Sequence, residues 1–202
     1  MHNGNFGLLL GACAALALAG CDRAGSAPEP QGHAGETAKA GAAHPTDPVE
    51  SAIAAAPASV SSDAAIVQAQ PDGSMKTLRE GHNGWTCMPD SPATPGPDPM
   101  CFDSNAAKWV EAWVGHKPPS ADAVGLMYML GGGTDASNTD PYATKPTADN
   151  DWVKTGPHIM VVGSKEILAG MPSGAKPDTS VPYVMWEGTP YAHLMVPVGD
   201  AS

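Results

Sequence analysis

The chain has 202 residues, of which 42% are hydrophobic, and a formal net charge of −11 from 21 acidic and 10 basic residues. So few Lys and Arg residues argue against a basic patch, and therefore against nucleic acid or anionic lipid surfaces as electrostatic partners. The length is sufficient for one ordinary domain that buries its own core.

The N-terminus has the pattern of a bacterial export signal. Residues 6–19 are mostly Leu, Ala and Gly and carry no charge, and this run is shorter than the roughly 20 apolar residues that a membrane-spanning helix needs. It therefore predicts a cleavable signal peptide over residues 1–20. The run ends in Leu18-Ala19-Gly20-Cys21, which resembles the lipobox of bacterial lipoproteins and predicts a lipid on Cys21. Residues 1–5 depart from the pattern, because they lack the Lys or Arg that usually precedes the apolar run of a signal peptide. The alternative interpretation of this run is a buried N-terminal helix.

The segment after Cys21 predicts a membrane tether. Residues 21–46 are rich in Ala, Gly and Pro and contain no large apolar side chain, which is the composition of a flexible linker. The expected location is the periplasmic side of a bacterial membrane, where the N-terminal lipid would anchor the protein. Asp22 resembles the inner-membrane retention signal of some lipoproteins. A single globular domain is expected over residues 47–202.

Cysteine usage supports an oxidising compartment. Cys13 would leave with the signal and Cys21 would be acylated, so Cys87 and Cys101 remain. A pair that closes a loop of about 15 residues in such a compartment predicts a disulfide. The alternative is a thiolate metal or redox site, although the spacing matches neither pattern. The proline-rich residues 88–99 exclude a helix or a central strand between the two cysteines.

The remaining pattern predicts an α+β fold with a mostly antiparallel sheet and one or two packed helices. Asp47 and Pro48 predict a helix start, and Ser104 is the expected N-cap of a second helix that ends before Gly115. Helices are expected over 48–56 and 104–114, with a helical turn over 165–169. Strands are expected over 64–70, 75–79, 84–88, 124–130, 157–163, 181–186 and 190–198, and a long polar loop over 134–155.

A tripeptide pattern occurs on two of the expected strands. His158 and Met160 are two residues apart, as are His193 and Met195, so each pair shares one face of its strand. If the two strands are neighbours, imidazole and thioether groups could converge as ligands for copper, especially Cu(I). This element resembles part of the motif of periplasmic copper chaperones. A packed core or the floor of a small-molecule pocket, with Tyr191 on the same face, are the alternatives.

The long loop carries a second polar cluster. Asp135 and Asp140 lie in its first half, and Asp149 to Asp151 lie in its second half. Oxygen ligands suit calcium, but the glycine and the glutamate of an EF-hand loop are missing. Turns in which these side chains bond the loop backbone are the preferred interpretation. A loop aspartate could also orient His158 or His193 for acid-base chemistry.

Several stretches resemble a group of uncharacterised proteobacterial exported proteins. They are Trp85-Thr86-Cys87-Met88-Pro89, residues 135–141, Gly156-Pro157-His158 and Tyr191-Ala192-His193. The resemblance spans about residues 64–198 and implies one domain, but it implies no activity.

Three hypotheses for function follow. The first is a lipid-anchored periplasmic binding protein for a copper-like metal or a small ligand, with His158, Met160, His193 and Met195 at the site. The second is a small periplasmic enzyme with a His and Asp acid-base pair. The third is a structural envelope lipoprotein without a site.

Overall fold

A computed structural model describes residues 45–94 and 96–199. The predicted signal peptide, the expected lipidation site Cys21, Asp22 and nearly all of the predicted tether therefore lie outside the described residues. Within the described ranges, no helix has the length and hydropathy needed to cross a bilayer.

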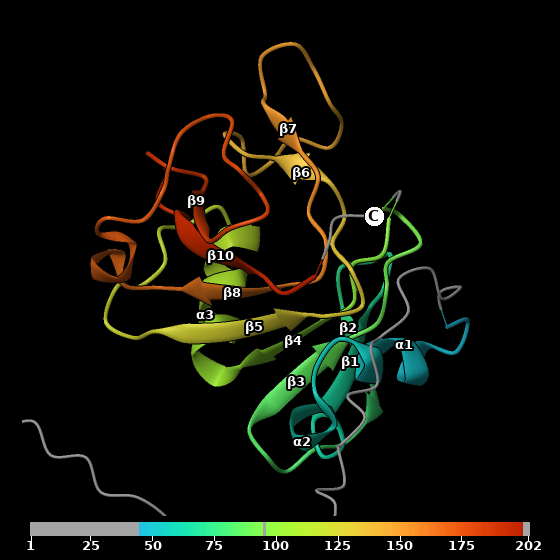
Figure 1. Ribbon diagram of the computed structural model, residues 1–202. Coiled ribbons are helices and arrows are strands. Elements are labelled where there is room, and N and C mark those ends of the chain that lie inside the picture. Colours follow the sequence, from blue (N-terminus) through green and yellow to red (C-terminus); the bar gives the residue numbers. More distant parts are fainter. Residues whose placement is uncertain (1–44, 95, 200–202) are drawn as a thin grey trace, which may run out of the picture. The chain divides into compact units, whose positions relative to one another are not determined.

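An eight-stranded sheet organises the described residues, with the strand order β2-β1-β3-β4-β5-β8-β10-β9 (Figure 1). All neighbouring strands are antiparallel except β1 and β3, which are parallel. The predicted α+β class with a mostly antiparallel sheet is thus confirmed. The strands of this sheet are β1 (Ala65–Ala69), β2 (Met75–Arg79), β3 (Trp85–Met88), β4 (Met100–Asp103), β5 (Gly125–Met129), β8 (His158–Val162), β9 (Tyr183–Met185) and β10 (His193–Pro197).

Short helices pack beside this sheet. They are α1 (Pro48–Ala54), α2 (Ala58–Ser61), α3 (Ser104–Val114) and the 3-10 turn η1 (Lys165–Leu168). Asp47 caps α1 as predicted, since its carboxylate accepts hydrogen bonds from the backbone N–H groups of Val49 and Glu50. The predicted cap of α3 was wrong by one residue, because Asp103, rather than Ser104, accepts from the N–H groups at the helix start. The positive end of the helix dipole also stabilises an ionised carboxylate at this position.

Several elements differ from the sequence prediction, and the unexpected short helix α2 is one of them. Strand β4 was not expected, because it has four residues and follows directly on the proline-rich segment. The residues of β4 form a strand because β3 and β5 pair with its two edges. The segment expected as a structureless loop contains a small separate ribbon of β6 (Ala136–Ser137) and β7 (Trp152–Val153).

Alternation along the strands builds a different core on each face of the sheet. On β4, Cys101 belongs to a cluster under α1, whereas its neighbour Phe102 belongs to the cluster under α3. Helix α3 lies against β4 and β5 (Figure 1). It approaches closely at Gly125, where a Cβ atom would lie 2.3 Å from the backbone nitrogen of Ala106. Glycine is therefore required there for the helix to dock on the sheet.

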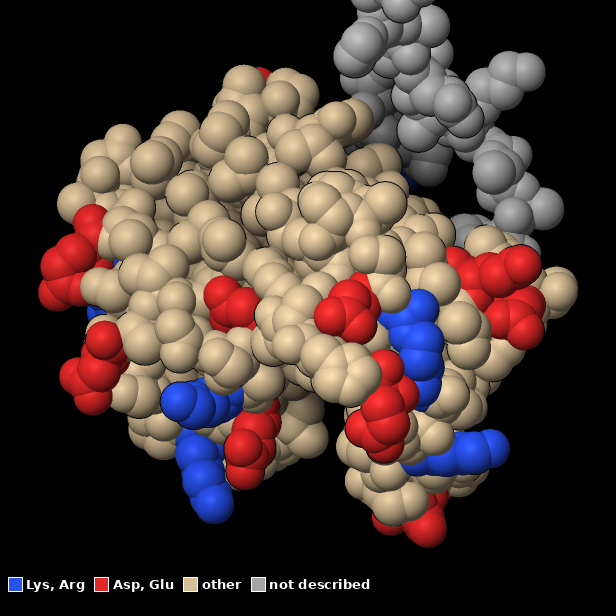
Figure 2. Space-filling view, turned by 90° about the horizontal axis from the view of Figure 1, so that it is seen from below, with Lys and Arg blue, Asp and Glu red and all other residues tan. Residues whose placement is uncertain are grey.

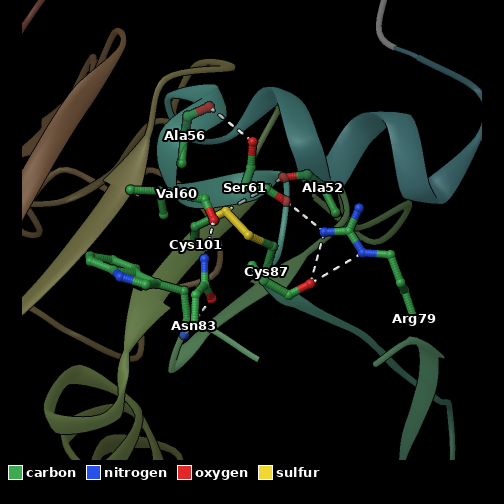
Figure 3. Close-up of a disulfide and its surroundings, with 10 residues drawn as sticks. Ala52, Ala56, Val60, Ser61, Arg79, Asn83, Cys87 and Cys101 are labelled. Carbon is green, nitrogen blue, oxygen red and sulfur yellow. Dashed lines mark hydrogen bonds between the residues drawn. A yellow bond between two sulfur atoms is a disulfide. The ribbon is translucent and has the colours of Figure 1, made fainter. Parts of the chain in front are cut away.

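The predicted disulfide between Cys87 and Cys101 is present, and it joins residues directly opposite each other on β3 and β4 (Figure 3). Both cysteines are fully buried. Polar side chains fix α2 beside them, because the Arg79 guanidinium donates to the carbonyl oxygens of Ser61 (2.5 Å) and Ala64 (2.8 Å). The Asn83 side-chain amide donates to the carbonyl oxygen of Val60 at 2.7 Å.

Removal of the disulfide should destabilise this half of the sheet. In a Cys87→Ala, Cys101→Ala double variant, the loss of the loop constraint on the unfolded chain should lower the free energy of unfolding by about 3 kcal/mol. Urea denaturation measures this difference, with Cys13→Ser as the control that leaves the bridge intact. An unchanged denaturation midpoint in the double variant would contradict the expectation.

Candidate functional site

A cavity of about 530 Å³ lies on the α3 side of the sheet. Helix α3, strands β4, β5, β8, β9 and β10, and parts of the segments between β3 and β4 and between β5 and β8 supply its walls. The volume falls in the range of about 300–1,000 Å³ that is typical of small-molecule sites. The apolar wall consists mainly of methionine and tryptophan side chains: Met100, Met127, Met129, Met160, Met185, Met195, Trp109, Trp113, Trp152 and Trp186.

Hydrogen bonds hold the segment between β5 and β8 over this cavity. The Trp186 indole N–H donates to the carbonyl oxygen of Ser137 at 2.9 Å, and its backbone N–H donates to that of Asn138 at 3.0 Å. The Tyr142 hydroxyl donates to the carbonyl oxygen of Trp113 at 3.0 Å, which joins the same segment to α3. The long polar segment therefore forms part of the cavity wall.

The four residues of the His-x-Met pattern all line this one cavity. Strands β8 and β10 are neighbours, as the metal hypothesis required, and Met160 lies directly opposite Met195. In this register, however, His158 lies opposite Pro197, and His193 lies opposite Met185 of β9. The two histidines are thus at opposite ends of the methionine pair, with their Cα atoms about 14 Å apart by strand spacing.

Both histidines are buried and held in one orientation. The Nδ1 atom of His193 is 2.9 Å from the carbonyl oxygen of Tyr191, and that of His158 is 2.7 Å from the carbonyl oxygen of Gly156. Because a carbonyl oxygen only accepts, Nδ1 carries the proton in each neutral ring, and Nε2 carries a lone pair. Burial lowers the pKa of His158, and burial together with repulsion from His158 lowers the pKa of His193 to about 4. Both rings are therefore uncharged at neutral pH.

The remaining candidate residues have structural contacts. Asp140 accepts a hydrogen bond from the backbone N–H of Tyr142 at 2.9 Å, and Asp135 accepts a longer one, 3.4 Å, from that of Thr155. Both aspartates line the cavity, but the hydrogen bonds of the two histidines go to backbone carbonyls. Tyr191 is buried beside the cavity wall, where its ring contacts Trp109 edge-on with centroids 6.2 Å apart.

The polar cluster of the long segment forms turns, as the preferred interpretation predicted. The Asn150 side chain accepts from the N–H of Thr147 (2.9 Å) and donates to the carbonyl oxygen of Lys145 (2.8 Å). Throughout residues 45–94 and 96–199, no group of three or more His, Cys, Asp or Glu side chains is arranged to hold a metal ion.

Sequence reasoning missed most of the aromatic wall. Trp109 and Trp113 of α3 belong to the core cluster under this helix, and both also line the cavity together with Trp186. The rings of Trp109 and Trp186 are parallel within 4°, and those of Trp113 and Trp186 have centroids 5.4 Å apart. The only sequence signal for this wall was the apolar stripe of α3, which does not distinguish a filled core from a cavity.

Asp98 is a further cavity residue that the sequence did not single out. Its carboxylate accepts hydrogen bonds from the backbone N–H of Ser91 (2.7 Å) and the hydroxyl of Thr94 (3.0 Å). Burial raises the pKa of Asp98 to about 6, and the nearby carboxyl group of Asp90 adds to this rise.

No protein-family model matches this chain, and neither a curated protein nor a solved structure matches it. Function is therefore inferred from the cavity and its surroundings. The described residues that line the cavity include no Lys or Arg. On the face shown in Figure 2, the Lys and Arg side chains are few and lie among Asp and Glu side chains, which is consistent with the absence of a basic patch there.

The buried histidine makes stability dependent on pH. His193 has a pKa of about 4 in the folded protein against an ordinary value of 6.5, so between these values the unfolded chain binds a proton that the folded protein does not. Acidification from pH 6.5 to pH 4 should therefore reduce the free energy of unfolding, by about 3 kcal/mol from this group alone. Urea denaturation at several pH values across this range should show that the free energy of unfolding falls less in His193→Gln than in the wild type.

Asp98 has the opposite effect, because its raised pKa means that the folded protein takes up a proton more readily than the unfolded chain. An Asp98→Asn variant should consequently lose more stability than the wild type between pH 6.5 and pH 4. Equal pH profiles for the wild type and both variants would contradict the assignment of these two groups.

Proposed function

We propose that this protein is a binding module that holds a small, mainly apolar ligand in the cavity. The observation that carries the proposal is a space of about 530 Å³ whose wall is built largely from Trp and Met side chains. A merely structural core would be packed without large voids, because protein interiors approach the density of organic crystals. Apolar walls with a few polar groups are the usual lining of ligand sites.

The contacts of the histidines favour binding over catalysis. A general base is normally oriented by a third group, often a carboxylate. Here the Nδ1 atoms of His158 and His193 bond the backbone instead. Asp135 and Asp140, the expected partners, contact backbone N–H groups.

The proposal includes a lipid anchor on the periplasmic side of a bacterial membrane. Its support is the apolar run of residues 6–19, the Leu-Ala-Gly-Cys sequence that ends at Cys21, and a buried disulfide, which persists in oxidising compartments. The tether after Cys21 would hold the binding module near the membrane.

Filling the cavity should abolish ligand binding. Ala136 lines the cavity and is half-buried, so Ala136→Trp would occupy the space that a ligand needs. Fluorescence enhancement of the apolar probe N-phenyl-1-naphthylamine measures binding, and the affinity should fall by about tenfold or more, equivalent to 1.4 kcal/mol.

The matched control is Ala121→Trp, because Ala121 is exposed and is not a cavity residue. Its affinity for the probe should equal that of the wild type. A wild-type protein that does not bind the probe, or equal binding by both tryptophan variants, would contradict the proposed function.

The lipid anchor has a separate test. Cells that express the full chain should incorporate labelled palmitate into the wild type and into Cys13→Ser, because Cys13 precedes the expected cleavage site. Cys21→Ser should remain unlabelled, since it lacks the thiol that accepts the lipid. Gel autoradiography measures the label, and its presence on Cys21→Ser would refute the anchor.

A further inference from the structure

Three side chains with soft or borderline donor atoms lie on one face of the sheet at the β9 and β10 end of the cavity. Met185 lies directly opposite His193 across these strands, and Met195 follows two residues later on the same face. Directly opposite residues have Cβ atoms about 4.5–5.5 Å apart. The three side chains are nearly sealed from solvent, with exposed fractions of 3%, 1% and 2% for Met185, His193 and Met195. They also line the same cavity.

The imidazole of His193 has one unused nitrogen. Its Nδ1 donates to the carbonyl oxygen of Tyr191 at 2.9 Å, and its buried Nε2 has no hydrogen-bond partner among the described residues. A histidine that ligates a metal usually donates its other ring N–H to such a carbonyl, which orients the ring. An unpaired buried acceptor is unfavourable, and a metal bond to Nε2 would relieve this cost.

The surroundings also favour a bound cation. The Trp109 and Trp186 rings are T-shaped to the imidazole, with centroid distances of 5.4 and 4.9 Å. No lysine or arginine of the described chain lines the cavity.

We propose that His193 Nε2 and the thioether sulfurs of Met185 and Met195 bind one Cu(I) ion. Thioethers are soft ligands that select Cu(I), whereas calcium and magnesium require oxygen ligands and structural zinc sites use thiolates, imidazoles or carboxylates. Silver(I) is a soft ion of the same charge and serves as a second probe. The site retains two members of the His-x-Met pattern, adds Met185, and leaves out His158, which the register places at the other end of the cavity.

The site does not depend on a small ligand in the cavity, so the two proposals can fail independently. Cu(I) affinity is measured by competition with bicinchoninate, whose Cu(I) complex is coloured, in the absence of oxygen and with ascorbate as reductant. The full chain is used with Cys13→Ser and Cys21→Ser, since free thiolates would bind Cu(I) themselves. This background chain should take up one Cu(I) ion in competition with bicinchoninate.

Single substitutions in this background test the three ligands. Met185→Leu and Met195→Leu remove a sulfur at nearly constant volume, and each should lower the affinity by about tenfold or more. His193→Gln should do the same. The matched controls are Met75→Leu and His82→Gln, because both residues are exposed and neither lines the cavity, and both variants should keep the affinity of the background chain.

Circular dichroism establishes that each variant is folded. X-ray absorption of the copper-loaded background chain identifies the atoms bound to copper, which a purely structural role of these residues would not affect. We expect one nitrogen and two sulfur neighbours of the copper ion. Failure to compete with bicinchoninate, equal losses in the Met75→Leu control, or a spectrum without sulfur neighbours would each overturn the copper site. Probe binding would be unaffected by any of these results, so the proposed function would remain.

Discussion

The antiparallel pairing of β5, β8, β10 and β9 determines which side chains can meet above the sheet. In this register Met127 lies opposite Met160, Met160 opposite Met195, and Met195 opposite Tyr183. Because residues two apart share a face, the histidines of β8 and β10 necessarily lie on either side of this row. A shift of the register by one residue would turn either strand's histidine to the opposite face. The cavity wall and the proposed copper site both depend on this pairing.

The two faces of the sheet have different roles. One face is packed against α1 and contains the buried disulfide, with small side chains such as Ala52 and Ala55 filling the cluster. The other face carries α3 and the large Met and Trp side chains, and a space remains between them. Strand β4 connects these roles, since Cys101 contributes to the first cluster and Phe102 to the second. The disulfide therefore braces the sheet without occupying the cavity.

Features that depend on neighbouring residues were predictable. The N-cap Asp47, the hairpin of β1 and β2 and the helix over 104–114 follow from local hydrogen bonding, turn chemistry and periodicity. The shared face of His158 and Met160 follows from strand geometry alone. Strand β4 was missed because its four residues have no distinctive pattern, and only the pairing with β3 and β5 makes them a strand. Met185 was missed because its contact with His193 is set by the register of β9.

The sequence by itself determined the α+β class, the pair of cysteines that form the disulfide, and the two His-x-Met strands, because composition and side-chain alternation act locally. Tertiary structure alone decided the strand order, the position of the long segment over the sheet and the separation of the two histidines. These depend on pairings between residues far apart in the chain, which local preferences do not specify. The cavity belongs to the second group, since an apolar stripe is equally compatible with a filled core, and only the packing of α3 and Trp186 leaves the space open.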